Sequence, residues 1–127
     1  MLKVHAKNLG NVVILCLQGR IVIGETETLR NAARSVSDAS AVVLDLARVT
    51  TVDARGLGVM LELRQEAEAK GVRFELMNIT RLVGRVLEVS RLDSVFQMTS
   101  GVEFFPAVAS GRRAALAAHG AAFAPCA

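Results

Sequence analysis

The sequence has 127 residues, of which 52% are hydrophobic and 21% are charged, and its formal net charge is +3. This length suits one compact domain, and this balance excludes a disordered chain. The apolar runs are far shorter than the roughly 20 residues of a membrane-spanning helix, and the N-terminus lacks the apolar centre of a signal peptide. We therefore expect a cytoplasmic protein without membrane insertion.

Short apolar runs alternate with helical stretches along the chain. In chain order the pattern predicts strand 3–7, strand 11–18, helix 25–37, strand 41–46, helix 54–70, strand 72–77, helix 81–89, a short strand near Val95–Met98, and a last helix from near Pro106 through Arg112–Ala118.

Local signals support these boundaries. The turn Asn8–Asn11 joins the first two strands as a hairpin, and the continuous apolar run Val12–Leu17 is typical of a strand buried on both faces. Gly71 is placed to end the second helix as a left-handed C-cap. Thr80 is placed to cap the start of the third helix.

Alternating strands and helices imply right-handed crossovers and a largely parallel sheet, while the first hairpin adds an antiparallel pair. The fold class is therefore α/β, with a small mixed β-sheet of about four to five strands and about four helices packed on it. We expect one domain over residues 1–119, followed by an Ala-rich tail, 120–127, that frays at its end.

The sequence contains no motif that indicates an enzymatic activity or a metal site. His5 and His119 lie at opposite ends of the chain, without the further ligands that a metal site needs. Gly56-Leu57-Gly58 opens a helix, but it lacks both the Lys of a phosphate loop and the third Gly of a dinucleotide motif. No basic stripe interleaved with aromatic residues predicts nucleic-acid binding. We expect neither enzymatic activity nor a cofactor.

The two cysteines are far apart in the sequence. Cys16 lies in an apolar strand, and Cys126 is the penultimate residue. This arrangement predicts a small core residue and a tail thiol, without a disulfide framework or a metal pair.

The start of the second predicted helix carries the most information. Asp53 is at the N-cap position, where a carboxylate accepts hydrogen bonds from free amides and contributes about 0.5–2 kcal/mol. Arg55 lies in the first turn, where a cation opposes the helix macrodipole at a cost of about 0.3–1 kcal/mol. Either Arg55 is a solvated side chain whose stem covers apolar surface, or it contacts a partner or an anion.

The pattern Asp-Leu-x(5)-Val-Asp-x-x-Gly-Leu-Gly-Val spans Asp45–Val59, and further matches occur at Leu17–Arg20, Glu27–Leu29, Met77–Thr80 and Leu92–Phe96. With these motifs the chain resembles, over about residues 3–110, the STAS domain shared by anti-sigma factor antagonists and the cytoplasmic tails of sulphate transporters. The resemblance implies a STAS-like fold and a protein-interaction function.

In anti-sigma factor antagonists the partner is a kinase-like anti-sigma factor, which phosphorylates a Ser or Thr just before the motif glycine and thereby ends binding. The resemblance therefore implies a partner-binding site made of Asp53, Ala54, Arg55, Gly56, Leu57 and Gly58.

The sequence departs from the antagonist pattern at its switch. Ala54 and Arg55 have no hydroxyl, so the usual phosphorylation site is missing, and Thr50 and Thr51 are only weak substitutes. Val22 also stands where many antagonists have an acidic residue. The alternative implied by the resemblance is a STAS subunit of a membrane transport assembly for lipids or anions. The edge near residues 3–7 would allow a weak homodimer.

Overall fold

The computed structural model describes residues 1–99 and 126, and the helix expected from Pro106 lies outside this range. The described elements are β1 (Lys3–Leu9), β2 (Val12–Ile21), α1 (Thr26–Arg34), β3 (Ala41–Val52), α2 (Ala54–Ala69), β4 (Arg73–Met77), α3 (Arg81–Val89) and β5 (Gln97–Thr99).

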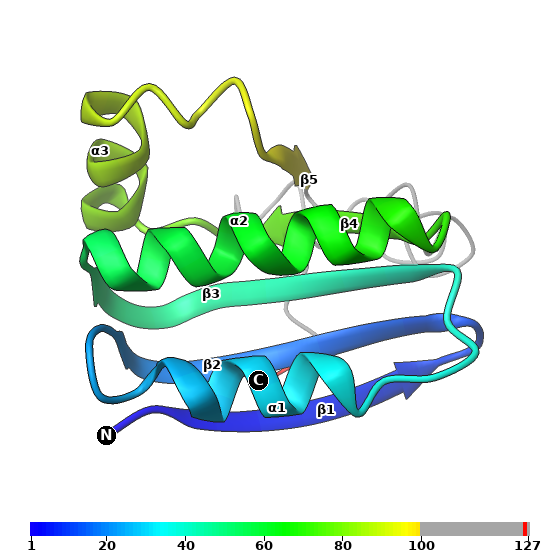
Figure 1. The fold of residues 1–127 in the computed structure, drawn as a ribbon. Helices are drawn as coiled ribbons and strands as arrows, with labels where there is room; N and C mark the ends of the chain where they lie inside the picture. The colour runs from blue at the N-terminus through cyan, green and yellow to red at the C-terminus, as the bar shows by residue number, and fades with distance from the viewer. Residues whose placement is uncertain (100–125, 127) are drawn as a thin grey trace, which may run out of the picture.

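The strands form one mixed sheet with the spatial order β1-β2-β3-β4-β5, and the antiparallel β1–β2 hairpin lies at one side (Figure 1). The β2–β3, β3–β4 and β4–β5 pairs are all parallel. This confirms the α/β class, the mixed sheet and the STAS-like fold predicted from the sequence. Three helices are present in the described range, against about four expected for the whole chain.

The core lies between the sheet and the helices. Leu15, Leu44 and Leu76 project from the three central strands, and all three are fully buried with Leu29 of α1 and Met60 of α2. The continuous apolar run in β2 is explained by burial on both faces. A second buried cluster, formed by residues such as Ile14 and Val43, lies on the opposite side of the sheet.

The observed boundaries correct two predictions. Helix α1 ends at Arg34, not at residue 37, and strand β3 continues to Val52, not to residue 46. The extension of β3 pairs with the second half of β2, in which Gln18–Ile21 continues the ladder across two register shifts. In this part of β3 Val49 and Val52 are buried, whereas polar residues such as Arg48 and Thr50 are exposed. These polar residues interrupt the apolar run, so the sequence pattern alone ends the strand too early.

The expectation of two separate thiols is wrong. Cys16 and Cys126 form a disulfide, and both half-buried residues pack against the second cluster. Their sequence separation of 110 residues carries no information about their distance in space. The domain limit at residue 119 and the expected fraying of the tail fall outside the described residues, apart from Cys126.

Replacement of Cys126 with Ser should lower the free energy of unfolding of the oxidised protein by about 2–4 kcal/mol, because a crosslink that closes a long loop restricts the unfolded chain. Chemical denaturation with and without a reductant measures this effect. Cys16→Ser should behave like Cys126→Ser, and neither variant should respond to the reductant. Equal stability of the oxidised wild type and both variants would contradict the crosslink.

Candidate functional site

The start of α2 lies at the end of the sheet where β2 and β3 finish. Figure 1 shows the β2–α1 turn and α3 at this same end, around the first turn of α2. The carboxyl ends of parallel strands are where open α/β sheets place their binding sites, because the connecting loops meet there. The sequence-predicted segment Asp53–Gly58 begins at this edge of the sheet.

Asp53 holds two chain segments together. Its Oδ1 accepts a hydrogen bond of 2.8 Å from the amide of Gly56, which confirms the predicted N-cap. Its Oδ2 accepts a second bond of 2.9 Å from the amide of Ile23 in the β2–α1 turn. The backbone amide of Asp53 donates to the carbonyl of Ile21 at 3.2 Å. One carboxylate thus fixes both the helix start and the neighbouring turn.

These contacts favour the charged carboxylate. The hydrogen bond from the amide of Ile23, and then that from Gly56, hold the pKa of Asp53 below its ordinary value. Asp53 therefore remains an anion at neutral pH and satisfies amides that would otherwise be free at the helix N-terminus.

Gly56 allows α2 to begin directly against the end of β2. A Cβ atom at this position would lie 1.9 Å from the carbonyl oxygen of Ile21 and 2.8 Å from its carbonyl carbon. Gly58 differs, because a Cβ there would meet nothing within 4 Å. The first glycine of the pair is thus required by packing, whereas the second leaves the helix surface open.

The six residues of the predicted partner-binding site differ in their exposure to solvent. Gly56 and Leu57 are buried, and the side chain of Leu57 belongs to the core and not to the surface. Ala54, Arg55 and Gly58 are exposed, while Asp53 is half-buried. The accessible part of the segment is therefore small and carries the cation of Arg55.

Sequence reasoning missed the apolar side chains at this end of the sheet. Ile23, in the turn that Asp53 holds, and Leu82, in the first turn of α3, are each 66% exposed. A large aliphatic residue in a turn beside glycine was the available signal for Ile23. Leu82 has the same appearance in the sequence as a core residue of an amphipathic helix.

The two substitute hydroxyls lie on β3 and not on the helix. Thr50 is exposed, and its Oγ1 donates a hydrogen bond of 3.3 Å to the carbonyl of Gly19. Thr51 is half-buried. Neither therefore takes the place of a hydroxyl in the first turn of α2. Within the described residues, no group of three or more metal-ligating side chains is present, and no helix is long and apolar enough to span a membrane.

Comparisons with known proteins agree with this fold. The model of the STAS domain family matches residues 3–111. A STAS-domain containing protein of Pseudomonas aeruginosa is 28% identical over 91 residues, which cover 71% of this chain and 90% of that protein.

Three solved structures have similar folds. An anti-sigma factor antagonist from Mycobacterium paratuberculosis has a TM-score of 0.69 at 20% identity, covering 77% of this chain and 85% of that one. A sulfate transporter family protein from Wolinella succinogenes has a TM-score of 0.60 at 18% identity, covering 72% and 80%. Mglu has a TM-score of 0.57 at 32% identity over 62% of this chain, which spans only 20% of Mglu.

Gly56→Ala should destabilise the protein by about 1–3 kcal/mol or more, because the added methyl group would overlap the Ile21 carbonyl. The matched control is Gly58→Ala, which should be neutral or stabilising by up to about 1 kcal/mol, because alanine favours the helix and meets open space. Thermal and chemical denaturation measure both. Equal effects of the two substitutions would show that α2 does not approach β2 so closely.

Asp53→Asn should remove stability that depends on pH. A group whose pKa is lowered in the folded state stabilises the protein above its unfolded pKa of about 3.9, and this contribution disappears as pH falls through the folded pKa. The wild type should therefore exceed the variant in unfolding free energy above about pH 5, and the difference should shrink under more acidic conditions. Asp93→Asn, which removes an exposed carboxylate elsewhere, is the charge-matched control. A constant difference at every pH would contradict this role.

Proposed function

This chain belongs to the STAS domain family, and we propose that it is a non-enzymatic regulatory domain that binds a kinase-like anti-sigma factor. The observation that carries the proposal is the start of α2, where Asp53 and Gly56 hold Ala54 and Arg55 exposed at this edge of the sheet. The structural likeness to anti-sigma factor antagonists supports the same choice of partner class.

The docking surface, which we define as Ile23, Ala54, Arg55, Gly58 and Leu82, combines apolar contact area with one cation. Exposed aliphatic groups supply the area that a partner would remove from water, and an arginine supplies a directional contact to a carboxylate. This chemistry suits a protein with an acidic rim around an apolar patch. It does not require nucleic acid or a membrane.

The missing hydroxyl changes the regulation that we propose. A phosphate at the first turn of α2 would add about −1.5 to −2 charges inside the docking surface. Residues 54 and 55 cannot accept one, and Arg55 instead provides a permanent positive charge. The proposed antagonist is therefore not inactivated by its partner at this position, and exposed Thr50 is a weak substitute on the adjacent strand.

The proposed partner implies a cytoplasmic location. Cytosolic reductants keep most protein thiols reduced, so the Cys16–Cys126 disulfide of the structure would form there only under oxidising conditions. The edge strand β1 would also allow a weak homodimer, although Lys3 and Lys7 on it oppose pairing with a second copy.

A second candidate function is a subunit of a membrane transport assembly. The specific observation in its favour is the fold similarity to the sulfate transporter family protein from Wolinella succinogenes, which is close in TM-score to that of the antagonists. The same docking surface would then meet a permease or an ATPase. The two candidates differ in the class of protein that binds.

Affinity capture with the tagged full chain from native lysate, followed by mass spectrometry, should recover a kinase-like anti-sigma factor. Arg55→Glu should reduce recovery and weaken the isolated complex at least about tenfold, because an interfacial charge is reversed. Lys3→Glu makes the same change in charge on β1 and should bind as the wild type does. A permease or ATPase in place of the kinase would select the transport function.

The captured kinase also tests the altered switch. With ATP it should leave residues 54–58 of the wild type unmodified and should phosphorylate Arg55→Ser, in which a hydroxyl precedes Gly56 again. Phosphate on Thr50 or Thr51 of the wild type would overturn the unswitched form of the proposal.

A further inference from the structure

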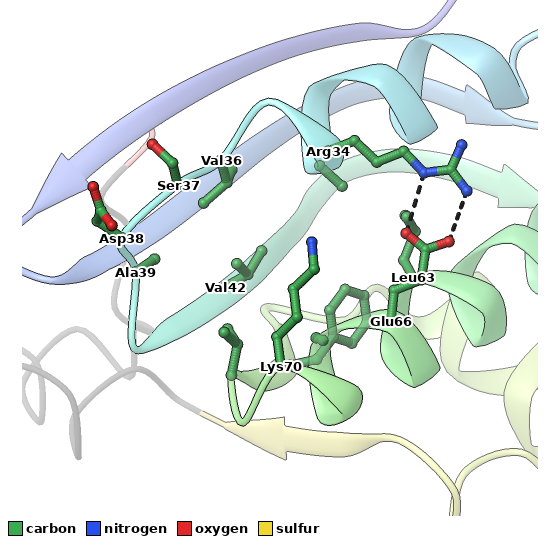
Figure 2. A pocket seen from close by; sticks show the side chains of 13 residues that line it. Arg34, Val36, Ser37, Asp38, Ala39, Val42, Leu63, Glu66 and Lys70 are labelled. Atoms are coloured by element: carbon green, nitrogen blue, oxygen red, sulfur yellow. Dashed lines mark hydrogen bonds and ion pairs between the residues drawn. The ribbon is translucent and has the colours of Figure 1, made fainter.

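A cavity of about 420 Å³ lies at the other end of α2, far along the helix from the docking surface (Figure 2). It is formed where α1 and α2 end and where β3 and β4 begin, and its lining includes Val42, Leu63 and Phe74. Pockets of about 300–1,000 Å³ with apolar linings and few polar groups are typical of small-molecule sites. Nothing in the proposed docking function uses this cavity.

The interior of the cavity is apolar. Val42, Leu63 and Phe74 are only 4–7% exposed and form its inner surface. Ala33 of α1 and Ala67 of α2 also line it, and these small side chains leave room between the two helices. A ligand that fills this space must therefore be largely hydrocarbon, because polar groups without hydrogen-bond partners are costly to bury there.

Two cations, Arg34 and Lys70, and two carboxylates, Asp38 and Glu66, lie at the mouth of the cavity. The guanidinium of Arg34 donates to both carboxylate oxygens of Glu66, at 3.1 and 2.7 Å, so these two charges neutralise each other. Arg34 accordingly lowers the pKa of Glu66. Figure 2 shows Lys70 extending across the mouth, outside this pair, whereas Asp38 lies at the far side. Among the described residues Lys70 forms no ion pair at contact distance, although its charge also helps to lower the pKa of Glu66.

Two of the last carbonyl groups of α2 accept hydrogen bonds from the chain that follows. The amides of Lys70 and Val72 both donate to the carbonyl of Ala67, and that of Gly71 donates to Glu68. These two carbonyl groups therefore compete little for a cation, and an anion at the mouth meets the ammonium group of Lys70.

We propose that this cavity binds a single-chain anionic amphiphile, with its alkyl chain against Val42, Leu63 and Phe74 and its carboxylate on Lys70. The size agrees, because a cavity of about 150 Å³ accepts a benzene ring, so this one accepts roughly 15 non-hydrogen atoms. A free alkyl carboxylate of about ten carbons has this size and charge. The site is independent of the partner that binds at the opposite end of α2.

Decanoate, kept below its micelle concentration, is the probe for isothermal titration calorimetry with the full chain. It should bind with a Kd below about 1 mM, as expected for a ligand of this size. Decanol and decyltrimethylammonium should bind at least about tenfold more weakly, because they cannot form the charged contact with Lys70. Chemical-shift changes of labelled Val and Leu methyl groups should include Val42 and Leu63.

Two variants test separately the charge of Lys70 and the volume of the cavity. Lys70→Gln should lower the affinity for decanoate at least about tenfold and leave the affinity for decanol unchanged. Ala67→Leu should abolish binding of both, because the larger side chain fills the cavity, whereas Ala69→Leu, on the exposed side of the same helix, should bind as the wild type does. Melting curves establish that each variant is folded.

Three results would overturn the proposal. The first is an absence of decanoate binding up to about 1 mM. The second is equal affinity for decanoate and decyltrimethylammonium, and the third is unchanged binding by the folded Ala67→Leu variant. Association with phosphatidylglycerol vesicles but not with free decanoate would indicate a lipid surface as the ligand and would equally contradict the site.

Discussion

The close approach of α2 to the end of β2 is the constraint on which the structure around the start of α2 depends. Gly56 permits the contact because it has no side chain to meet the Ile21 carbonyl. Asp53 then bonds both the new helix and the turn that follows β2. Because one carboxylate serves two segments, the helix start and the turn hold each other in place. The surface that they present is therefore organised before any partner arrives.

The hydrogen bonds of Asp53 fix the backbone on which the exposed residues Ala54 and Arg55 lie. A side chain in the first turn of α2 is held by backbone that is already fixed by Asp53, so it presents its charge at a defined position. Arg55 opposes the helix dipole there, which is unfavourable for the helix alone. A partner that supplies a carboxylate would offset that cost, whereas an added phosphate on this turn would reverse the local charge.

The sequence was sufficient where local chemistry decides the structure. The Asp53 cap and the mixed sheet follow from spacing and hydrophobic pattern, and the STAS-like arrangement follows from the family resemblance. It was insufficient where distant segments decide. The length of β3 depends on its pairing with β2, and the Cys16–Cys126 bond joins residues from opposite ends of the chain. The exposed position of Leu82 likewise depends on how α3 packs, because its spacing in the sequence suits a buried face equally well.

Helix α2 connects the two proposed sites. Its 16 residues span about 24 Å, with the docking surface at one end and the cavity at the other. Met60 and Leu63 are buried between them, so the helix is held along its length by the core. A ligand in the cavity contacts Leu63 and Ala67, and a partner contacts Ala54 and Arg55. Because the buried middle of α2 separates the two ends, each proposed site can be altered by substitution without direct contact with the other.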